Sequence, residues 1–139
     1  MSKLYLHEQL TERVIGAAIA MHRVLGPGFL ESIYEEGFTH ELCARKISFE
    51  RQVPVNVGYQ GKVIGLHRLD LLIEGKVVVE LKAIKQIDDV HIAVALSYLK
   101  ASGLNIALIL NFAQATVGVK RVVHGKRPFD TEALSLGGR

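Results

Sequence analysis

Residues 68–83 read Arg-Leu-Asp-Leu-Leu-Ile-Glu-Gly-Lys-Val-Val-Val-Glu-Leu-Lys-Ala, and this stretch determines the fold that we expect. Apolar residues alternate with other residues on both sides of Glu74-Gly75-Lys76, as in two strands joined by a turn. The two apolar sets must face the same side of the hairpin, because a slip of one residue moves every side chain to the other face. A three-residue loop gives this match and pairs Leu71 with Val79.

The same register pairs Leu69 with Leu81 and places Asp70 directly opposite Glu80, with Cβ atoms ~5 Å apart on one face. Two facing carboxylates repel each other unless a cation lies between them. A divalent metal ion would meet this need, and oxygen-only ligation favours Mg²⁺ or Mn²⁺ over zinc. The backbone carbonyl of Leu81 could add a further ligand.

Two basic residues beside the pair leave a second interpretation open. Lys82 lies beside Glu80 and opposite Arg68, so the charges could instead form a solvated cross-strand cluster of salt bridges. If a metal ion binds, Lys82 could orient a water molecule and offset charge in a phosphoryl transition state. The hairpin pattern by itself is compatible with both interpretations.

The rest of the chain predicts three helices and further strands. Apolar residues at helical spacing indicate a helix over 6–25 and another over 30–46, with Gly26-Pro27-Gly28 between them. The inner side of the second helix should contain Leu30, Ile33, Phe38 and Leu42. The predicted strands cover about 49–57, 62–73, 77–83, 105–112 and 117–123, and a third helix capped by Asp88 or Asp89 runs to about Lys100.

This order, α-α-β-β-β-α-β-β, predicts an α/β fold with a mixed sheet of about five strands flanked by helices. The chain has 139 residues, of which 49% are hydrophobic and 22% charged, so we expect a single globular domain over 1–139. Residues 1–5 and 125–139 are polar ends that we expect to be flexible. The strand over 105–112 is nearly all apolar, which predicts a central position in the sheet.

Cysteine content and hydropathy narrow the class of protein. Cys43 is the single cysteine, which excludes an internal disulfide and a cysteine-based zinc site, and we expect it beside the core. The N-terminal segment lacks the apolar stretch of a signal peptide, and no apolar run approaches the ~18 residues of a membrane span. A cytoplasmic protein without a membrane partner is the expectation.

The charge distribution suggests where a polyanion would bind. The net charge is +3, with pI ≈ 9.1. Residues 1–59 hold six basic and seven acidic residues, a net of −1, whereas 60–139 hold eleven and seven, a net of +4. Nucleic acid should therefore prefer the second part of the chain. The basic residues that could follow a phosphate backbone there are Lys82, Lys85, Lys100, Lys120, Arg121, Lys126 and Arg127. His91, in the first turn of the third helix, lies near the expected phosphate position.

Several motifs in order resemble one family. The stretch Gly28-Phe29-Leu30-Glu31-Ser32-Ile33-Tyr34 resembles the pattern that names the GxxExxY proteins. The later signatures of that family resemble the segments 68–70, 79–83, 97–100 and 109–112, in the same order. The resemblance covers about 10–123. GxxExxY proteins are placed in the PD-(D/E)XK nuclease-like superfamily, so the resemblance implies a restriction-endonuclease-like core.

The resemblance also implies a site. Asp70 would be the superfamily's aspartate, Glu80 and Lys82 its E-x-K element, and Glu31 an acid from the helix before the sheet. These residues would bind Mg²⁺ or Mn²⁺ and activate water for phosphodiester cleavage. Tyr34 and Tyr98 would shape or support the site, and the residues expected to contact substrate also include Arg68, Lys85 and His91. The sequence departs from the superfamily's Gln-x-x-x-Tyr pattern, because Val94 stands four residues before Tyr98.

Two classes of function follow from these observations. The first is a metal-dependent nuclease that acts on nucleic acid, DNA rather than RNA. The alternative is a non-catalytic module that binds nucleic acid or protein on a retained nuclease scaffold, and Val94 favours it. A homo-oligomer is compatible with the sequence in either case, as is a purely structural homo-oligomeric protein.

Overall fold

The structure of the protein, a computed structural model, describes residues 6–125, and it confirms the predicted fold class and element order. The expected flexible ends, 1–5 and 125–139, lie outside the described residues except for Gly125, as do Lys126 and Arg127. Each predicted element is present, with ends that shift by at most two residues. The elements are α1 (Glu8–Leu25), α2 (Glu31–Ala44), β1 (Phe49–Tyr59), β2 (Lys62–Ile73), β3 (Val77–Lys82), α3 (Asp89–Ser102), β4 (Ile106–Asn111) and β5 (Gly118–Val123).

The five strands form one mixed sheet in the order β1-β2-β3-β4-β5. All neighbours are antiparallel except β3 and β4, which are parallel and therefore need a crossover. Helix α3 provides it. Every residue of β4 is buried, which confirms the central position that its apolar sequence predicts.

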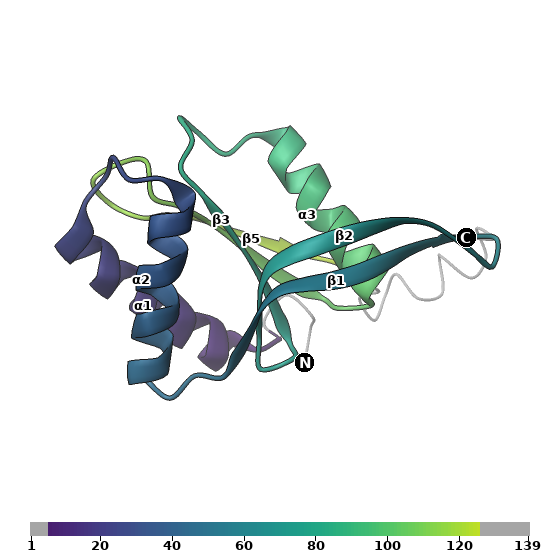
Figure 1. Cartoon of the computed structure of the whole chain (residues 1–139), viewed down its shortest axis with the longest axis horizontal. Helices are drawn as coiled ribbons and strands as arrows, with labels where there is room; N and C mark the ends of the chain where they lie inside the picture. Colours follow the sequence, from purple (N-terminus) through teal and green to yellow (C-terminus); the bar gives the residue numbers. More distant parts are fainter. Residues whose placement is uncertain (1–5, 126–139) are drawn as a thin grey trace.

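Helices cover both faces of the sheet (Figure 1). Helices α1 and α2 pack on one face, in a cluster that includes Val14, Phe38 and Leu108. Helix α3 packs on the other face, where Leu99 and Ile109 belong to a second cluster. No helix within residues 6–125 has the length and apolar character needed to cross a membrane.

Helix α2 differs from the expectation in its rotation. Its buried stripe contains Tyr34, Phe38 and Leu42, whereas the predicted core residues Leu30 and Ile33 are 75% and 46% exposed. Positions 34, 38 and 42 are each four apart and share one face of the helix, whereas Ile33 lies about 100° around the helix axis from Tyr34. Leu30 precedes the helix as its N-cap, with an extended backbone. Helix rotation also exposes Cys43, which was expected beside the core.

Candidate active site

The β2–β3 hairpin has the predicted register near its turn, but the strand pairing ends before it reaches Asp70 and Glu80. Leu71 pairs with Val79, as expected for a three-residue loop. The predicted pair of Leu69 with Leu81 is wrong, because Leu69 packs on the α3 side of the sheet and Leu81 on the opposite side. The two strands therefore separate at the residues that carry the acids.

An irregular residue in β1 explains this separation. Gln52 has a φ of 54°, in the left-handed region that residues with a side chain rarely adopt in a strand. The β1–β2 ladder lacks the pair that Gln52 would form with Asp70, although pairs on both sides are present. The alternation of side chains along β2 is interrupted there, and Leu69 consequently turns to the α3 side.

The Asp70 carboxylate occupies the gap between the separated strands. Its Oδ2 accepts a hydrogen bond from the Leu81 backbone N–H at 2.9 Å. In a regular antiparallel ladder a backbone carbonyl of β2 would accept this hydrogen bond instead. The carbonyl of Leu81 points to the same side, because the N–H and C=O of one residue in an extended strand face the same neighbour. Oxygens from Asp70 and Leu81 thus face the opening between β2 and β3.

Glu80 is the buried member of the acid pair, with only 6% of its surface exposed. Its Oε1 is buried and has no hydrogen-bond partner. Burial and the neighbouring Asp70 carboxylate raise the pKa of Glu80 to about 9, and burial also raises the pKa of Asp70. Without a cation, the pair therefore retains a proton at neutral pH that solvated carboxylates would release.

The nearby basic residues do not neutralise the pair through ion pairs. Within residues 6–125, no ion pair joins either acid to Lys82 or Arg68. Arg68 is exposed and donates a hydrogen bond to the backbone carbonyl of Gln52 at 3.2 Å. Lys82 is half-buried near both acids, and its charge only partly offsets the rise in their pKa values that burial causes. The cross-strand salt-bridge cluster, the second interpretation of the sequence, is therefore not formed.

The donor set at this point of the sheet fits a divalent cation. Two carboxylates, one with an unpartnered buried oxygen, lie beside a backbone carbonyl, and all three offer oxygen ligands. Mg²⁺ commonly binds proteins through one or two carboxylates and keeps several water ligands. The part of the chain that the structure describes contains no group of three His, Cys, Asp or Glu side chains placed to hold a metal ion. Water would therefore complete the coordination.

Glu31 and Lys85 lie near the end of β3 but are not joined to the acid pair. The Oε2 of Glu31 accepts a hydrogen bond from the Ala83 backbone N–H at 3.1 Å, directly after Lys82. Glu31 therefore attaches the start of α2 to the end of β3 and does not complete a three-acid cluster. Lys85 is exposed, and its backbone carbonyl accepts a hydrogen bond from the Gln114 side chain at 2.8 Å.

A small, partly open pocket lies on the α3 side of the site. His91 and Val94 contribute to it from the first half of α3. The Nδ1 of His91 accepts a hydrogen bond from the Asp88 backbone N–H at 3.1 Å and lies 3.0 Å from the Asp88 Oδ1, so Nε2 is the ring nitrogen outside these contacts. Val94 forms an apolar part of the wall. The residues that line the pocket are Glu80, Lys82, His91, Val94, Ala95 and Ile109.

The two predicted tyrosines differ in burial, and neither is among the residues that line the pocket. Tyr98 is half-buried against the His67 ring, with centroids 4.5 Å apart. Burial, together with the charges of Glu80 and Asp70, raises the pKa of Tyr98, so its hydroxyl remains a proton donor. Tyr34 is fully buried, so the expectation that it contacts substrate is wrong. Its hydroxyl instead supports the turn between α1 and α2, through Gly26 and Phe29.

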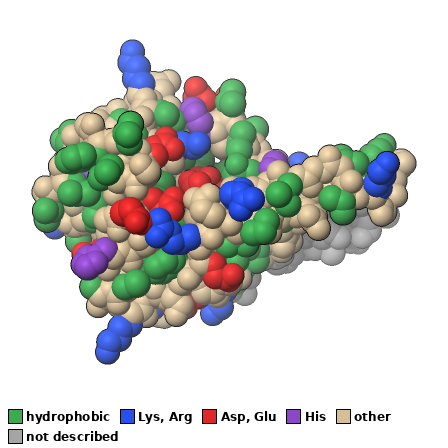
Figure 2. All heavy atoms as spheres, viewed as in Figure 1, with side chains coloured by type: hydrophobic (Ala, Val, Ile, Leu, Met, Phe, Trp, Pro, Cys, Tyr) green, Lys and Arg blue, Asp and Glu red, His purple; other side chains and the backbone are tan. Residues whose placement is uncertain are grey.

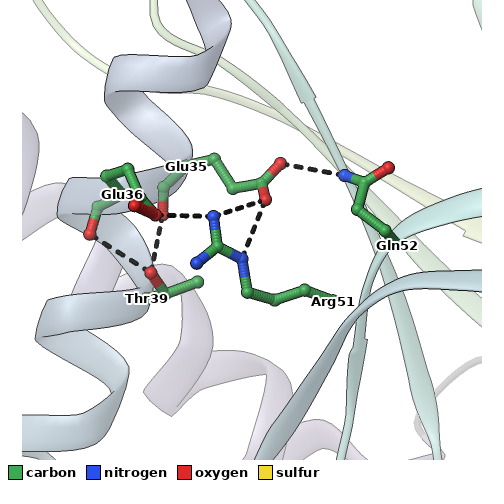
Figure 3. A network of polar contacts seen from close by, with 5 residues as sticks. All are labelled: Glu35, Glu36, Thr39, Arg51 and Gln52. Carbon is green, nitrogen blue, oxygen red and sulfur yellow. Dashed lines mark hydrogen bonds and ion pairs between the residues drawn. The ribbon is translucent and has the colours of Figure 1, made fainter.

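A polar network that the sequence did not indicate lies beside the acid pair. In Figure 3, Glu35 of α2 accepts hydrogen bonds from Arg51 at 3.0 Å and Gln52 at 3.2 Å, and Arg51 also contacts Glu36. Figure 2 shows acidic and basic side chains gathered on this face. The charge of Glu35 adds to the effect of burial on the pKa of Asp70. Two consecutive acids in a helix resemble an ordinary solvated face, so the role of Glu35 could not be recognised from the sequence.

Asn111, at the end of β4, is a second residue whose role the sequence did not indicate. It is 2% exposed, and its amide donates to the backbone carbonyl of Ile84 at 2.9 Å and accepts from the Ile84 N–H at 3.0 Å. The Asn111 amide thus pairs with both backbone groups of Ile84, as a residue of a neighbouring strand would, and it fixes the segment that follows Lys82. A polar residue at the end of an apolar strand was the available signal.

The fold is similar to that of a protein of known structure. A crystal structure of the protein SSO0001 superposes with a TM-score of 0.52 and 16% sequence identity, over 76% of this chain and 55% of that chain. This chain thus spans about half the length of SSO0001, and the likeness concerns the fold alone. No curated protein matches the sequence.

The family comparison covers most of the chain. A model described as PD-(D/E)XK nuclease superfamily matches residues 8–122, a range that runs from the first residue of α1 into β5. The match includes the separated β2–β3 strands, the acid pair and the lysine two residues after Glu80. Family match and strand topology agree, and the chain belongs to the PD-(D/E)XK nuclease superfamily.

Proposed function

We propose that this protein is a metal-dependent nuclease that hydrolyses phosphodiester bonds in nucleic acid, with DNA rather than RNA as its substrate. The observation that carries the proposal is the buried Glu80, whose Oε1 lacks a partner while the Asp70 carboxylate lies beside it. A buried, unpaired acid destabilises a fold, so its presence on a nuclease scaffold favours a ligand that offsets its charge. Mg²⁺ or Mn²⁺ is the cation that the all-oxygen donor set favours.

The residues of the pair and their neighbours would divide the chemistry between them. Asp70, Glu80 and the carbonyl of Leu81 would hold the ion, which when bound supplies an activated water and a positive charge for the phosphate. Lys82 lies beside Glu80 in the pocket, where its ammonium group could orient that water and stabilise negative charge that develops on the scissile phosphate.

The substrate would lie across the pocket and the exposed basic residues next to it. His91 offers its Nε2–H to a phosphate oxygen from the start of α3, where the helix dipole also favours an anion. The Tyr98 hydroxyl is a further donor, and the exposed Arg68 and Lys85 could bind neighbouring phosphates. Glu31 positions the end of β3 in this proposal, through its contact with Ala83.

The proposal includes a narrower family assignment and a location. The Gly28–Tyr34 motif supports a place among the GxxExxY proteins, because Glu31 contacts the strand of the site and Tyr34 supports the turn before it. A nucleic-acid substrate in turn favours the cytoplasm as the location of the protein.

A cleavage assay with matched variants tests the proposed function. Supercoiled and linear duplex DNA, single-stranded DNA and RNA are incubated with the protein in Mg²⁺, in Mn²⁺ and in EDTA. We expect cleavage in the presence of either metal, none in EDTA, and none by Glu80→Gln. The matched control is Glu74→Gln, since Glu74 is an exposed acid in the turn of the same hairpin. It should retain the wild-type rate.

Two results would overturn this proposal. Equal cleavage by wild type and Glu80→Gln would mean that the activity does not come from this site. A folded wild-type protein that cleaves no substrate in either metal would favour a non-catalytic binding module. The non-catalytic module is favoured by Val94, because this residue forms an apolar part of the pocket wall. Such a module would bind nucleic acid without metal, and with an affinity that falls steeply with salt.

A further inference from the structure

The hairpin of β1 and β2 continues far beyond the helices that cover the rest of the sheet (Figure 1). We name residues 56–66 the projecting ribbon. All of them are exposed except Val57, which is half-buried. None of them belongs to either core cluster, although Val53 and Val55 at the base of the ribbon pack against the α3 cluster. The core of the protein therefore does not require the projecting ribbon.

The projecting ribbon is nevertheless an ordered element. Its strands pair from Asn56–Leu66 to Tyr59–Lys62, with an irregularity after Val57. The connecting residues 60 and 61 have φ values of 49° and 78°, and two positive φ angles are typical of a tight hairpin turn. A two-stranded ribbon with no second layer is only marginally stable by itself, so a partner that covers it is expected.

The charge of this region favours a polyanion as that partner. Residues 52–69 contain no acidic residue, but they contain Lys62 and Arg68. Neither of these two forms an ion pair within residues 6–125. Figure 2 shows hydrophobic and basic side chains, and no acidic ones, on the visible face of the ribbon. The large exposed apolar residues of the ribbon are Tyr59, Val63, Ile64 and Leu66.

The dimensions of the projecting ribbon match a groove of duplex DNA. The major groove is ~12 Å wide and admits a two-stranded β-ribbon, whose apolar side chains can contact thymine methyl groups. Strand β2 runs without a break in the chain from Lys62, at the ribbon tip, to Asp70 in the site. At ~3.3 Å per residue this separation is about 26 Å, or about eight base pairs.

From this geometry we infer that the projecting ribbon enters a groove of duplex DNA and holds the duplex at a fixed distance from the bond that is cut. The inference rests on the proposed nuclease function and adds to it the class of substrate, a duplex. Because β2 carries both the ribbon and Asp70, contacts at the tip would set the position of the cleaved bond, at a distance of about eight base pairs.

A shortened variant tests this inference. Residues 57–65 are replaced by Asn-Gly, so that the natural pair Asn56–Leu66 flanks a two-residue turn. Binding to a short DNA duplex and to its single strand is measured by fluorescence anisotropy in EDTA, at several salt concentrations. We expect duplex affinity to fall at least about tenfold, as for the loss of several groove contacts, and single-strand affinity to change less.

A single substitution at the tip provides an independent test with a matched control. Lys62→Gln should lower the slope of log affinity against log salt by about one, because one phosphate contact is lost. Lys76→Gln changes another exposed lysine, in the turn at the other end of β2, and it should leave the slope unchanged.

The outcomes separate this inference from the proposed function. If wild type and the shortened variant bind and cleave duplex DNA equally well, the ribbon inference is wrong while the nuclease proposal stands. If light scattering shows a wild-type dimer that becomes a monomer on shortening, with unchanged DNA affinity, the ribbon binds a second copy of the chain instead. If wild type neither binds nor cleaves nucleic acid, both proposals fail together.

Discussion

Glu80 combines two properties that are costly in a folded domain, because it is nearly fully buried and one of its oxygens has no partner. Its pKa is raised from 4.5 to about 9 by burial and by Asp70. Between these two pH values the folded protein holds a proton that the unfolded chain has released. The contribution of this group to stability is therefore complete at low pH and is lost as the pH rises toward 9.

This reasoning predicts a pH-dependent stability in the absence of metal. In EDTA, the free energy of unfolding of the wild type should fall between about pH 5 and pH 9, by up to about 1.4 kcal/mol per pH unit. Glu80→Gln removes the titrating group and should give a flatter profile, with the variant more stable than wild type at the alkaline end. Urea unfolding at a series of pH values measures both profiles, and parallel profiles would contradict the assignment.

Helix α3 contributes three residues to the pocket, His91, Val94 and Ala95, and Val94 is the larger of the two apolar ones. An amide at this position could donate a hydrogen bond to a water or phosphate in the pocket beside Lys82. One such hydrogen bond would stabilise the bound state by about 1 kcal/mol of free energy. Helix α3 is fixed to the sheet through the buried Ala95 and Leu99, whereas Val94 is 42% exposed, so a polar residue at position 94 does not disturb the core.

We therefore predict that Val94→Gln increases the rate of cleavage about fivefold, the equivalent of one hydrogen bond in the transition state. The melting temperature should remain close to that of the wild type. Val90→Gln is the control, because Val90 is on the same helix, is 69% exposed and does not line the pocket. A rate that falls in Val94→Gln, or that rises equally in both variants, would show that Val94 has no such role.

The elements also show where the sequence was informative and where it was not. Alternation fixed the register of β2 and β3 near their turn, because apolar residues must share a face there. Alternation could not predict the separation at Asp70, which depends on the left-handed backbone of Gln52 in a third strand. The burial of Tyr34 was missed for a similar reason, since the rotation of α2 depends on how it packs against α1 and the sheet.

At the scale of the whole molecule, the topology brings distant segments to the end of β3. The parallel pair β3–β4 requires the α3 crossover, which therefore begins close after β3, with His91 in its first turn. Glu31, at the start of α2, reaches the same place through Ala83. The order of elements and the central position of β4 could be predicted from sequence. The contacts of Glu35 with β1 could not, because they join residues that are far apart in the chain.

Calorimetric titration of Mn²⁺ or Mg²⁺ into the metal-free protein measures whether Asp70 and Glu80 bind a divalent metal ion. We predict saturable binding at millimolar or lower metal concentrations, with release of a proton to the buffer, because metal must displace the proton that the pair retains. Glu80→Gln should abolish this binding, and Glu74→Gln should preserve it. Equal binding by wild type and Glu80→Gln, or no saturable binding by a folded wild type, would show that Asp70 and Glu80 do not form a metal site.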